Sequence, residues 1–417
     1  MYSLMGELFP LNRSLTGEGV RETFKILSRY VKFNIQEIST GEKVFDWEIP
    51  YEWSIKQAYI KDSEGNVIVD FKNNNLHVVG YSEPVNGLFT LDEIQPHLHS
   101  LEDQPNAVPY ITSYYKRNWG FCMNHTERLK LDAGPYNVLI ESTLFKGSMT
   151  FADYVIPGDT KQEVVFTTYI CHPSMASNEL SGPVVLTYLI NWLESLPTRR
   201  YTYRFIFAPE TIGAITYLSL NLKSLKETVV AGFVVTCLGD DKCYSFVKSR
   251  YGNTYADRIS SCVLKEYSNA KIYSYLERGS DERQYCFPGV ELPFVALCRT
   301  KFYEYPEYHT SLDNMDYCSP EALSNSLIYL QNHILLIENN KRYVINSTCE
   351  PQLGKRNLYP NISTKESNNT VQELMDLIVY CDGANDIIDI AEITHIPWKK
   401  LITIVNQLQE HSLLNEI

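Results

Sequence analysis

Hydrophobic and polar positions alternate along residues 163–340 in a way that predicts an α/β domain. Four short apolar runs are typical of buried strands, and longer stretches with apolar positions at helical spacing lie between and after them. The predicted strands are Glu163–Thr168, Arg204–Ala208, Gly232–Thr236 and Phe294–Leu297. The predicted helices are Pro183–Ser195, Ile212–Ser224, Thr254–Tyr267 and Pro320–Glu338. Because such alternation builds a mostly parallel sheet, we expect helices on both of its faces.

A different pattern occupies residues 41–158. Helical periodicity largely disappears there, and short alternating stretches separated by turn residues replace it. These stretches lie at Lys56–Val69, Leu76–Tyr81 and Tyr136–Phe145. The preceding residues 1–40 contain a helical pattern at Val20–Val31 and an alternating one at Asn34–Thr40. We therefore expect a β-rich domain at 41–158, inserted into an α/β domain made of residues 1–40 and 159–345.

The character of the chain changes again after the α/β region. Residues 346–370 are polar and indicate a linker. Residues 371–417 then contain three short helical patterns, which predict a helix-turn-helix core. They lie at Gln372–Cys381, Asp386–Ile393 and Pro397–Glu410. This last segment holds eight acidic and two basic residues, so we expect it to mediate packing or dimerisation rather than DNA binding.

Charge and composition narrow the classes of partner. A net charge of −13 disfavours nucleic acid as a partner. The ten cysteines include no CxxC pair, which favours a reducing cytoplasm over a disulfide framework. The first residues lack the apolar core of a signal peptide, and no uncharged apolar run reaches ~18 residues, so we expect neither secretion nor a membrane partner. A homo-oligomer formed through the C-terminal helices stays open.

Polar clusters follow the predicted strands, at the edge of the sheet where catalytic groups collect in open α/β folds. His172 follows the first strand, Glu210 the second and Asp240 the third, and His309 comes later in the chain. Two histidines with carboxylates at successive strand ends are typical of a zinc hydrolase. An acid at the edge of an apolar wall has a raised pKa, so Glu210 is a candidate general base.

Each of these residues also has a simpler interpretation. His172 could be a loop histidine satisfied by hydrogen bonds. Glu210 could complement the positive end of a helix dipole, and Asp240 could be a solvated turn aspartate. Asp313 could support the imidazole of His309. A cysteine nucleophile is disfavoured, because Cys171 and His172 would point to opposite faces of a strand.

Five blocks of sequence resemble the M28-type zinc aminopeptidases, and more closely a bacterial group of the DUF4910/DUF2172 type. That group adds a β-rich insertion and a C-terminal winged-helix-like domain to an aminopeptidase-like domain. The blocks are Leu8–Gly19, Cys171–Ala176, Pro209–Gly213, Gly279–Tyr285 and Glu307–Ser311. The resemblance covers nearly the whole chain. It implies a three-layer α/β catalytic domain with the β-rich insertion, and a winged-helix-like domain at 371–417.

The resemblance also implies a metal site. His172 matches the first histidine ligand of the family pattern, Asp240 the later aspartate ligand and His309 the last histidine ligand. Glu210 matches the general base. The aspartate that bridges two zinc ions in the family falls on Asn178 here.

A second position also departs from the family pattern, since Thr211 stands where a glutamate ligand is expected. A neutral amide at Asn178 cannot offset two divalent cations as a carboxylate does. We therefore expect one zinc ion rather than two. Its ligands would be His172 and Asp240 with Asn178 or Glu179, or a different set that includes His309 and Glu210.

These implications lead to an expected function. The chain would be a cytoplasmic, metal-dependent hydrolase of the aminopeptidase type, in which metal-activated water attacks an amide and Glu210 is the general base. The substrate would be a small peptide or an aminoacyl or N-acyl small molecule. The residues expected to contact substrate are Glu179, Asp281, Arg283 and Tyr308. The alternative is a non-hydrolytic relative with altered chemistry at Asn178 and Thr211, acting in binding or in a surface-sugar pathway.

Overall fold

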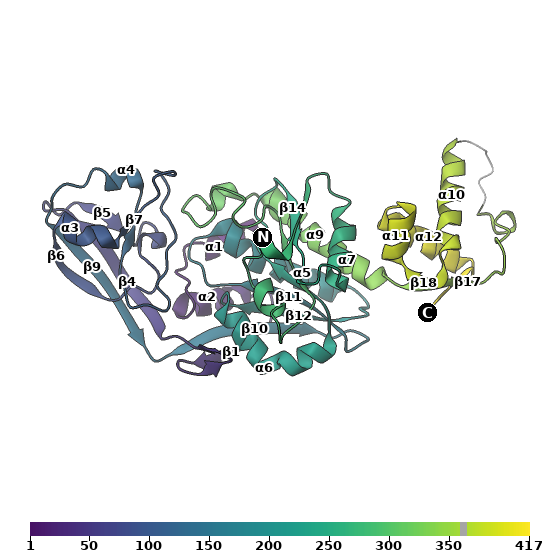
Figure 1. Ribbon diagram of the computed structural model, residues 1–417, viewed down its shortest axis with the longest axis horizontal. Helices are drawn as coiled ribbons and strands as arrows, with labels where there is room; N and C mark the ends of the chain where they lie inside the picture. The colour runs from purple at the N-terminus through teal and green to yellow at the C-terminus, as the bar shows by residue number, and fades with distance from the viewer. Residues whose placement is uncertain (359–364) are drawn as a thin grey trace. The chain divides into compact units, whose positions relative to one another are not determined.

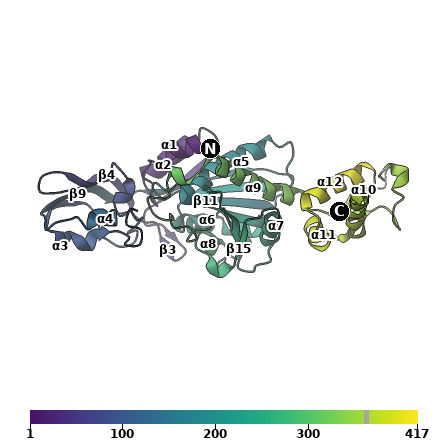
Figure 2. The ribbon, with the colours of Figure 1, turned by 90° about the horizontal axis from the view of Figure 1, so that it is seen from above.

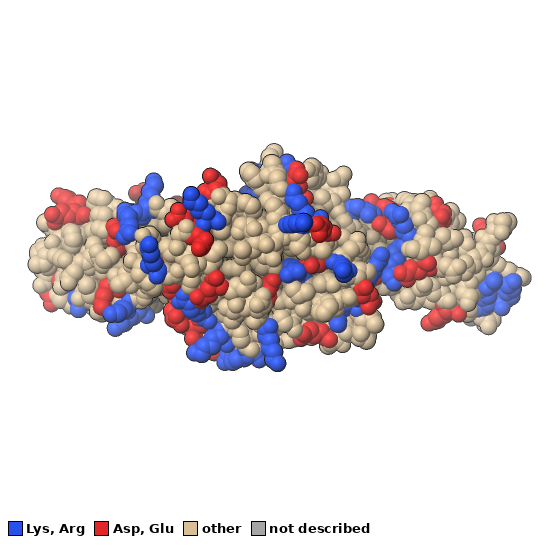
Figure 3. Space-filling model, turned by 90° about the horizontal axis from the view of Figure 1, so that it is seen from below, with Lys and Arg blue, Asp and Glu red and all other residues tan. Residues whose placement is uncertain are grey.

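The computed structural model describes residues 1–358 and 365–417, and the chain divides into two compact units (Figure 1). The first unit comprises residues 1–256 and 271–328, and the second comprises residues 257–270 and 329–417. Among the described residues, no helix is long and apolar enough to cross a bilayer. On the face drawn in Figure 3, Lys and Arg side chains are interspersed with Asp and Glu side chains.

An eight-stranded mixed sheet forms the core of the first unit, with the order β1-β10-β12-β11-β13-β16-β14-β15. Its central strands are β12 (Thr202–Ala208), β11 (Glu163–Tyr169), β13 (Val229–Val235) and β16 (Phe294–Cys298). Neighbouring central strands are parallel, whereas β1–β10, β10–β12 and β14–β16 are antiparallel. The outer strands are β1 (Asn34–Ser39), β10 (Ser148–Ile156), β14 (Tyr244–Val247) and β15 (Ala270–Tyr273). The four predicted strands are therefore confirmed as the parallel centre of the sheet.

Crossover helices cover both faces of this sheet. The chain runs from β11 through α5 (Ser181–Ser195) to β12, and from β12 through α6 (Ile212–Thr228) to β13. Since β12 and β13 lie on opposite sides of β11, right-handed crossovers place α5 and α6 on opposite faces. Figure 2 shows α1 (Tyr2–Leu8) on the side of α5, and α8 (Glu282–Tyr285) on the side of α6. The loops after β11 and β12 therefore flank a switch point in strand order, where α/β folds bind ligands.

A close approach of backbone fixes the start of α5. A Cβ atom on Gly182 would lie 2.2 Å from Oγ1 of Thr168 and 2.7 Å from the carbonyl oxygen of Val235. Only glycine therefore lets the first turn of α5 pack against the ends of β11 and β13. The helix α2 (Glu18–Leu27) confirms the pattern predicted at 20–31, whereas α1 was not predicted.

Residues 41–158 are rich in short strands. The main sheet there has the order β5-β4-β9-β6. Its strands are β4 (Glu52–Lys61), β5 (Val67–Asp70), β6 (Val85–Phe89) and β9 (Tyr136–Phe145). The smaller elements are β2 (Lys43–Val44), β3 (Trp47–Glu48), α3 (Leu91–Ile94), β7 (Leu98–His99), β8 (Phe121–Cys122) and α4 (His125–Arg128). The strand predicted at 76–81 is wrong, because Asn74 accepts a hydrogen bond from the backbone of Leu76 and starts a 3-10 turn. The strand β10, also within 41–158, belongs to the eight-stranded sheet.

The second unit combines helices with a three-stranded antiparallel sheet of order β18-β17-β19. The helices are α7 (Tyr255–Leu264), α9 (Pro320–Asn339, shared with the first unit), α10 (Lys365–Val379), α11 (Ile387–Thr394) and α12 (Trp398–Glu410). The strands are β17 (Arg342–Ile345), β18 (Asp382–Asp386) and β19 (Leu414–Glu416). This confirms the winged-helix-like arrangement. Of the linker predicted at 346–370, residues 359–364 lie outside the described residues, and α10 begins inside that range.

Candidate active site

Two loops at the carboxyl ends of adjacent parallel strands carry the candidate site. The strands β11 and β12 are in register up to the pair Tyr169 and Ala208, so the loops that follow leave the sheet side by side. The first loop carries His172 and the second carries Glu210. Their side chains meet, with Nε2 of His172 3.8 Å from Oε2 of Glu210. The structure thus brings together the two candidates that the sequence placed at successive strand ends.

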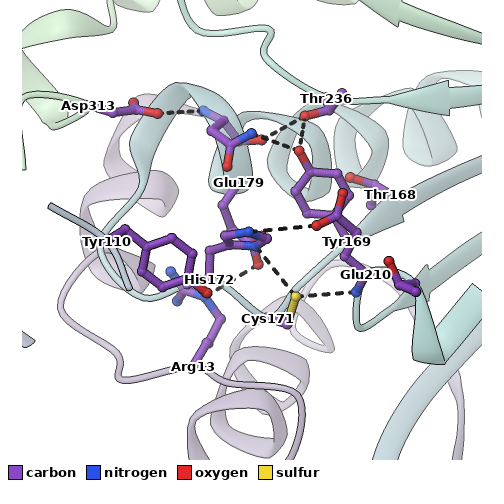
Figure 4. A network of polar contacts seen from close by, with 12 residues as sticks. Arg13, Tyr110, Thr168, Tyr169, Cys171, His172, Glu179, Glu210, Thr236 and Asp313 are labelled. Carbon is purple, nitrogen blue, oxygen red and sulfur yellow. Dashed lines mark hydrogen bonds and ion pairs between the residues drawn. The ribbon is translucent and has the colours of Figure 1, made fainter. Parts of the chain in front are cut away.

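A buried carboxylate fixes the other side of the His172 ring (Figure 4). Nδ1 of His172 lies 2.8 Å from Oε2 of Glu179, and Sγ of Cys171 lies 3.4 Å from the same nitrogen. Nε of Arg13 donates to the carbonyl oxygen of His172 at 3.0 Å and lies 3.8 Å from Oε1 of Glu179. Burial lowers the pKa of His172, but Tyr110, Cys171 and Glu179 outweigh that effect and hold the pKa well above its ordinary value. Because the contact with Glu179 fixes Nδ1, the other ring nitrogen, Nε2, points toward Glu210.

A π-helical turn at Ala176–Leu180 places Asn178 beside this network. The carboxylate of Asp313 holds the turn, because it accepts from the backbone N–H of Ser177 at 2.6 Å and of Asn178 at 2.9 Å. The side-chain amide of Asn178 donates to the hydroxyl of Tyr169 at 2.8 Å. Its Oδ1 is buried and has no hydrogen-bond partner among the described residues. Irregular helical turns of this kind are frequent at functional sites.

His309 approaches from a loop that pairs with the β-rich segment. The backbone N–H of Tyr110 donates to the carbonyl oxygen of His309 at 2.9 Å, and the two rings meet edge to face at 5.1 Å. The ring centroids of His309 and His172 are 5.2 Å apart. Burial and the nearby His172 lower the pKa of His309 well below its ordinary value. Nε2 of His309 is buried without a partner among the described residues, and Asp313 holds the 176–180 turn rather than supporting His309 as predicted.

The candidate residues open onto a cavity of about 420 Å³. Its wall includes Cys171, His172, Glu210, Thr211, Arg283 and His309 from the α/β region, and Trp47, Tyr110, Thr112, Tyr114 and Tyr115 from the β-rich segment. Burial raises the pKa of Glu210 above its ordinary value. A carboxylate with a raised pKa in a cavity of this size can accept a proton from a bound reactant near neutral pH.

Thr211 immediately precedes α6 and has a strained backbone conformation, with φ 64° and ψ −75°. Residues other than glycine rarely adopt positive φ, and such strain is found mostly where structure serves function. Two side chains hold Thr211 there. Oδ1 of Asp281 accepts from its backbone N–H at 2.8 Å, and Nη2 of Arg283 donates to its Oγ1 at 2.6 Å. The Thr211 hydroxyl is therefore engaged by Arg283.

We expect Asp281→Asn to stabilise the protein, and to do so more as the pH rises. Burial and the charge of Glu210 raise the pKa of Asp281 to about 8 in the folded chain, against about 3.9 in the unfolded chain. The folded state thus retains a proton that the unfolded state loses, so the free energy of unfolding falls between these values by up to ~1.4 kcal/mol per pH unit. An asparagine can still accept from Thr211 and does not titrate.

Urea unfolding at pH 5, 6, 7 and 8 measures this effect. The advantage of Asp281→Asn over the wild type should grow with each step. A constant difference across the series would show that Asp281 is ionised in the folded protein.

Asp240, a predicted metal ligand, forms hydrogen bonds with Thr300 in the structure. Its carboxylate accepts from Oγ1 of Thr300 at 2.6 Å and from the backbone N–H of Thr300 at 3.1 Å. Among the described residues, the group of side chains able to hold a metal ion consists of Cys171, His172 and Glu179, without Asp240. The structure therefore gives Asp240 a role in fixing the loop of Thr300.

The residues expected to contact substrate fall into two sets. Arg283 lines the cavity. Glu179 and Asp281 are buried and are not part of its wall. Tyr308 also lies outside the wall and stacks on His309 with ring centroids 3.9 Å apart. Three of the four side chains thus brace the site, and one faces the space where a substrate would bind.

Two residues of the network were not expected from the sequence. Cys171 was assigned to the strand face opposite His172, but β11 ends at Tyr169, so both residues lie in the loop and their side chains meet. Burial raises the pKa of Cys171 to about 11, so its thiol is protonated at neutral pH. Arg13 comes from the far N-terminal segment, and its only signal was its place in the family-like block Leu8–Gly19.

Comparison with known proteins supports this fold assignment over the whole chain. Residues 2–340 match the family described as a domain of unknown function (DUF4910), and residues 341–416 match the winged helix-turn-helix family. A Clostridium acetobutylicum protein is 41% identical over 420 residues, which cover 99% of this chain and 95% of the relative. That relative is provisionally named a polysaccharide biosynthesis protein with an aminopeptidase-like domain.

Solved structures of peptidases share the fold of this chain. A crystal structure provisionally named a peptidase, also from Clostridium acetobutylicum, has a TM-score of 0.93 at 39% identity, and covers 100% of this chain and 96% of its own. A zinc aminopeptidase from Bacillus subtilis has a TM-score of 0.56 at 13% identity, over 81% of this chain and 93% of its own. An M28 peptidase precursor from Shewanella amazonensis has the same score and identity, over 84% and 94%. The two similarities at 13% identity concern the fold alone.

Proposed function

The chain belongs to the family described as a domain of unknown function (DUF4910), and we propose that it hydrolyses an amide bond in a small peptide or in an aminoacyl or N-acyl small molecule. The main support for the proposal is that His172 and Glu210 lie together on the wall of a cavity, with Nε2 of His172 3.8 Å from Oε2 of Glu210. Amide hydrolysis needs a proton acceptor for water and a proton donor for the leaving amine. Glu210, with its raised pKa, can serve both steps in turn.

The donor atoms around His172 fit one divalent cation. The ligand atoms of Cys171, His172 and Glu179 all lie within 4.8 Å of one another. Oδ1 of Asn178 and Nε2 of His309 are buried without partners among the described residues, and such atoms are natural ligands. We propose that His172 and Glu179 would hold the ion together with one of these two atoms. A bound zinc ion would supply Lewis acidity toward the amide carbonyl.

The same residues do not fit two cations. Asn178 is neutral where a bridging carboxylate would be needed, and the hydroxyl of Thr211 accepts from Arg283. The guanidinium of Arg13 lies 3.8 Å from Glu179 and offsets its negative charge. A binuclear centre needs more negative charge than this set supplies. We therefore propose a single ion that is bound weakly.

The chain's own residues would then divide the reaction between them. Glu210 takes the proton from the attacking water and delivers it to the nitrogen of the leaving amine. Arg13 holds the loop of His172 in place, because its Nε donates to the carbonyl oxygen of His172. Tyr110 covers the site from the β-rich segment and limits access of bulk water, which strengthens electrostatic interactions inside the cavity.

A panel of amides tests the proposal. The purified chain, equilibrated with zinc, would be assayed for amine release from dipeptides, aminoacyl anilides and N-acetyl amino acids. We expect hydrolysis of at least one class and its loss after treatment with a chelator. Absence of hydrolysis across the panel, with zinc bound, would overturn the proposal.

A second candidate function rests on the two departures from the family pattern, at Asn178 and Thr211. The amide of Asn178 donates to Tyr169 and the hydroxyl of Thr211 accepts from Arg283, so both side chains have structural partners of their own. The chain could therefore be a non-hydrolytic relative that binds an intermediate of a surface-sugar pathway, in keeping with the name of its Clostridium relative. Binding of an amide without turnover, by protein that holds zinc, would favour this second function.

A further inference from the structure

A second and larger cavity adjoins the candidate active site. It measures about 850 Å³ and shares Trp47, Arg283 and Gln284 with the wall of the first cavity. Most of its remaining wall is apolar, and includes Phe45, Leu218, Leu222, Phe287 and Val290. The two cavities therefore meet at Arg283, close to the residues that would perform the hydrolysis. A ligand that extends from one cavity into the other would contact these shared side chains.

Arg283 has an unused donor at this junction. Nη2 donates to Oγ1 of Thr211, whereas Nε is buried and has no hydrogen-bond partner among the described residues. No carboxylate among those residues forms an ion pair with Arg283, although its charge acts on Glu210. A guanidinium with a free buried N–H in a largely apolar wall is a site for an anionic acceptor.

The charges around the larger cavity also favour an anionic ligand. Three arginines line it, with a single acid, Asp46. Arg250 is paired with Glu291 at 3.0 Å, and Arg278 stacks on Tyr275 with its guanidinium carbon 4.7 Å from the ring centroid. Both of these arginines thus have a partner for their charge, although Nε of Arg250 is also buried without a hydrogen-bond partner among the described residues. Of the three arginines, Arg283 is the one that also lines the smaller cavity. On a chain of net charge −13, this wall is a local excess of positive charge that favours an anion.

We propose that the substrate carries a carboxylate that Arg283 binds, and a bulky apolar group that enters the larger cavity. This inference rests on the proposed amide hydrolysis, and it narrows the substrate to N-acyl amino acids or short peptides with a free C-terminal carboxylate. A planar guanidinium pairs with a carboxylate through two parallel hydrogen bonds, which fixes orientation as well as position. The carboxylate would thereby hold the amide beside Glu210.

Calorimetric binding of two matched probes tests the inference without requiring turnover. The probes are N-acetyl-L-phenylalanine and N-acetyl-L-phenylalaninamide, which differ only in the carboxylate. We expect the wild type to bind the acid about tenfold more tightly than the amide. Arg283→Met should bring the two affinities within about threefold of each other. Arg283→Lys, which keeps the charge and loses the bidentate geometry, should give an intermediate ratio.

A matched control removes a cation that lines neither cavity. Lys223 is an exposed residue of α6, and Lys223→Met should leave the preference for the acid unchanged. Equal binding of the two probes by the wild type, or an acid preference that survives in Arg283→Met and Arg283→Lys, would overturn the inference. The acid preference with no hydrolysis of any amide would instead overturn the proposed function and leave this binding site in place.

Discussion

Replacing Glu210 with glutamine should reduce amide hydrolysis by about 10²- to 10⁴-fold while leaving the fold intact. The amide is the same size as the carboxylate but cannot take a proton from water. The backbone N–H of Glu210, which lies 3.2 Å from Sγ of Cys171, is unaffected by the change. Affinity for zinc should also be unchanged, because Glu210 is not part of the Cys171, His172 and Glu179 group.

The measurement is kcat/KM for the best amide of the substrate panel, together with the unfolding temperature of each variant. Glu227→Gln is a matched control, since Glu227 is an exposed acid on α6 that lines neither cavity. Its activity should stay within about twofold of the wild type. If Glu210→Gln kept wild-type activity with an unchanged unfolding temperature, Glu210 would not be the general base.

Asn178→Asp should have the second large effect. It should lower the stability of the folded chain without metal and increase the stabilisation that zinc provides. In the absence of metal the new carboxylate is buried, next in sequence to the buried Glu179, and Asp313 accepts from the backbone N–H of the same residue, so we expect a loss of about 1–3 kcal/mol in the free energy of unfolding. With zinc bound the same charge becomes a ligand, so affinity for zinc should rise at least about tenfold. Zinc should then raise the unfolding temperature of the variant more than that of the wild type.

Thermal unfolding in chelator and in excess zinc measures both arms of this prediction. Asn73→Asp serves as the control, because Asn73 is exposed and does not belong to the group of Cys171, His172 and Glu179 that could hold a metal ion. A variant that is as stable as the wild type in chelator and gains nothing from zinc would show that residue 178 does not face a cation. Faster amide hydrolysis by the zinc-loaded variant than by the zinc-loaded wild type would show that the native chain has drifted from peptidase activity.

The strands at the centre of the main sheet were predictable because burial on both faces leaves a simple signal. All seven residues of β11 are buried, and Val164, Val165, Thr167 and Thr168 among them are β-branched. The positions of His172 and Glu210 followed from that strand and the next, since parallel strands in register release their loops at one edge. The local sequence pattern was therefore sufficient to predict that His172 and Glu210, the pair on which the proposed function rests, lie at the same edge of the sheet.

The rest of the site depends on contacts between distant segments, which no local pattern encodes. Arg13 reaches Glu179 from the N-terminal segment, and Tyr110 reaches His309 from the β-rich segment. The partner of Asp240 is Thr300, which follows a later strand, so its engagement could not be foreseen from the aspartate alone. Spacing along the chain predicts which edge of the sheet a residue occupies, whereas tertiary packing decides its partner.

The zinc content of the chain is the most direct test of the central claim, a hydrolytic site that holds one metal ion. The protein would be dialysed to equilibrium against zinc, and the zinc on both sides of the membrane measured by elemental mass spectrometry, with Asn178→Asp in parallel. The account predicts about one zinc per wild-type chain, held by the group that contains His172 and Glu179. Two zinc ions per chain would contradict the argument from Asn178 and Thr211, and none would contradict the metal site itself.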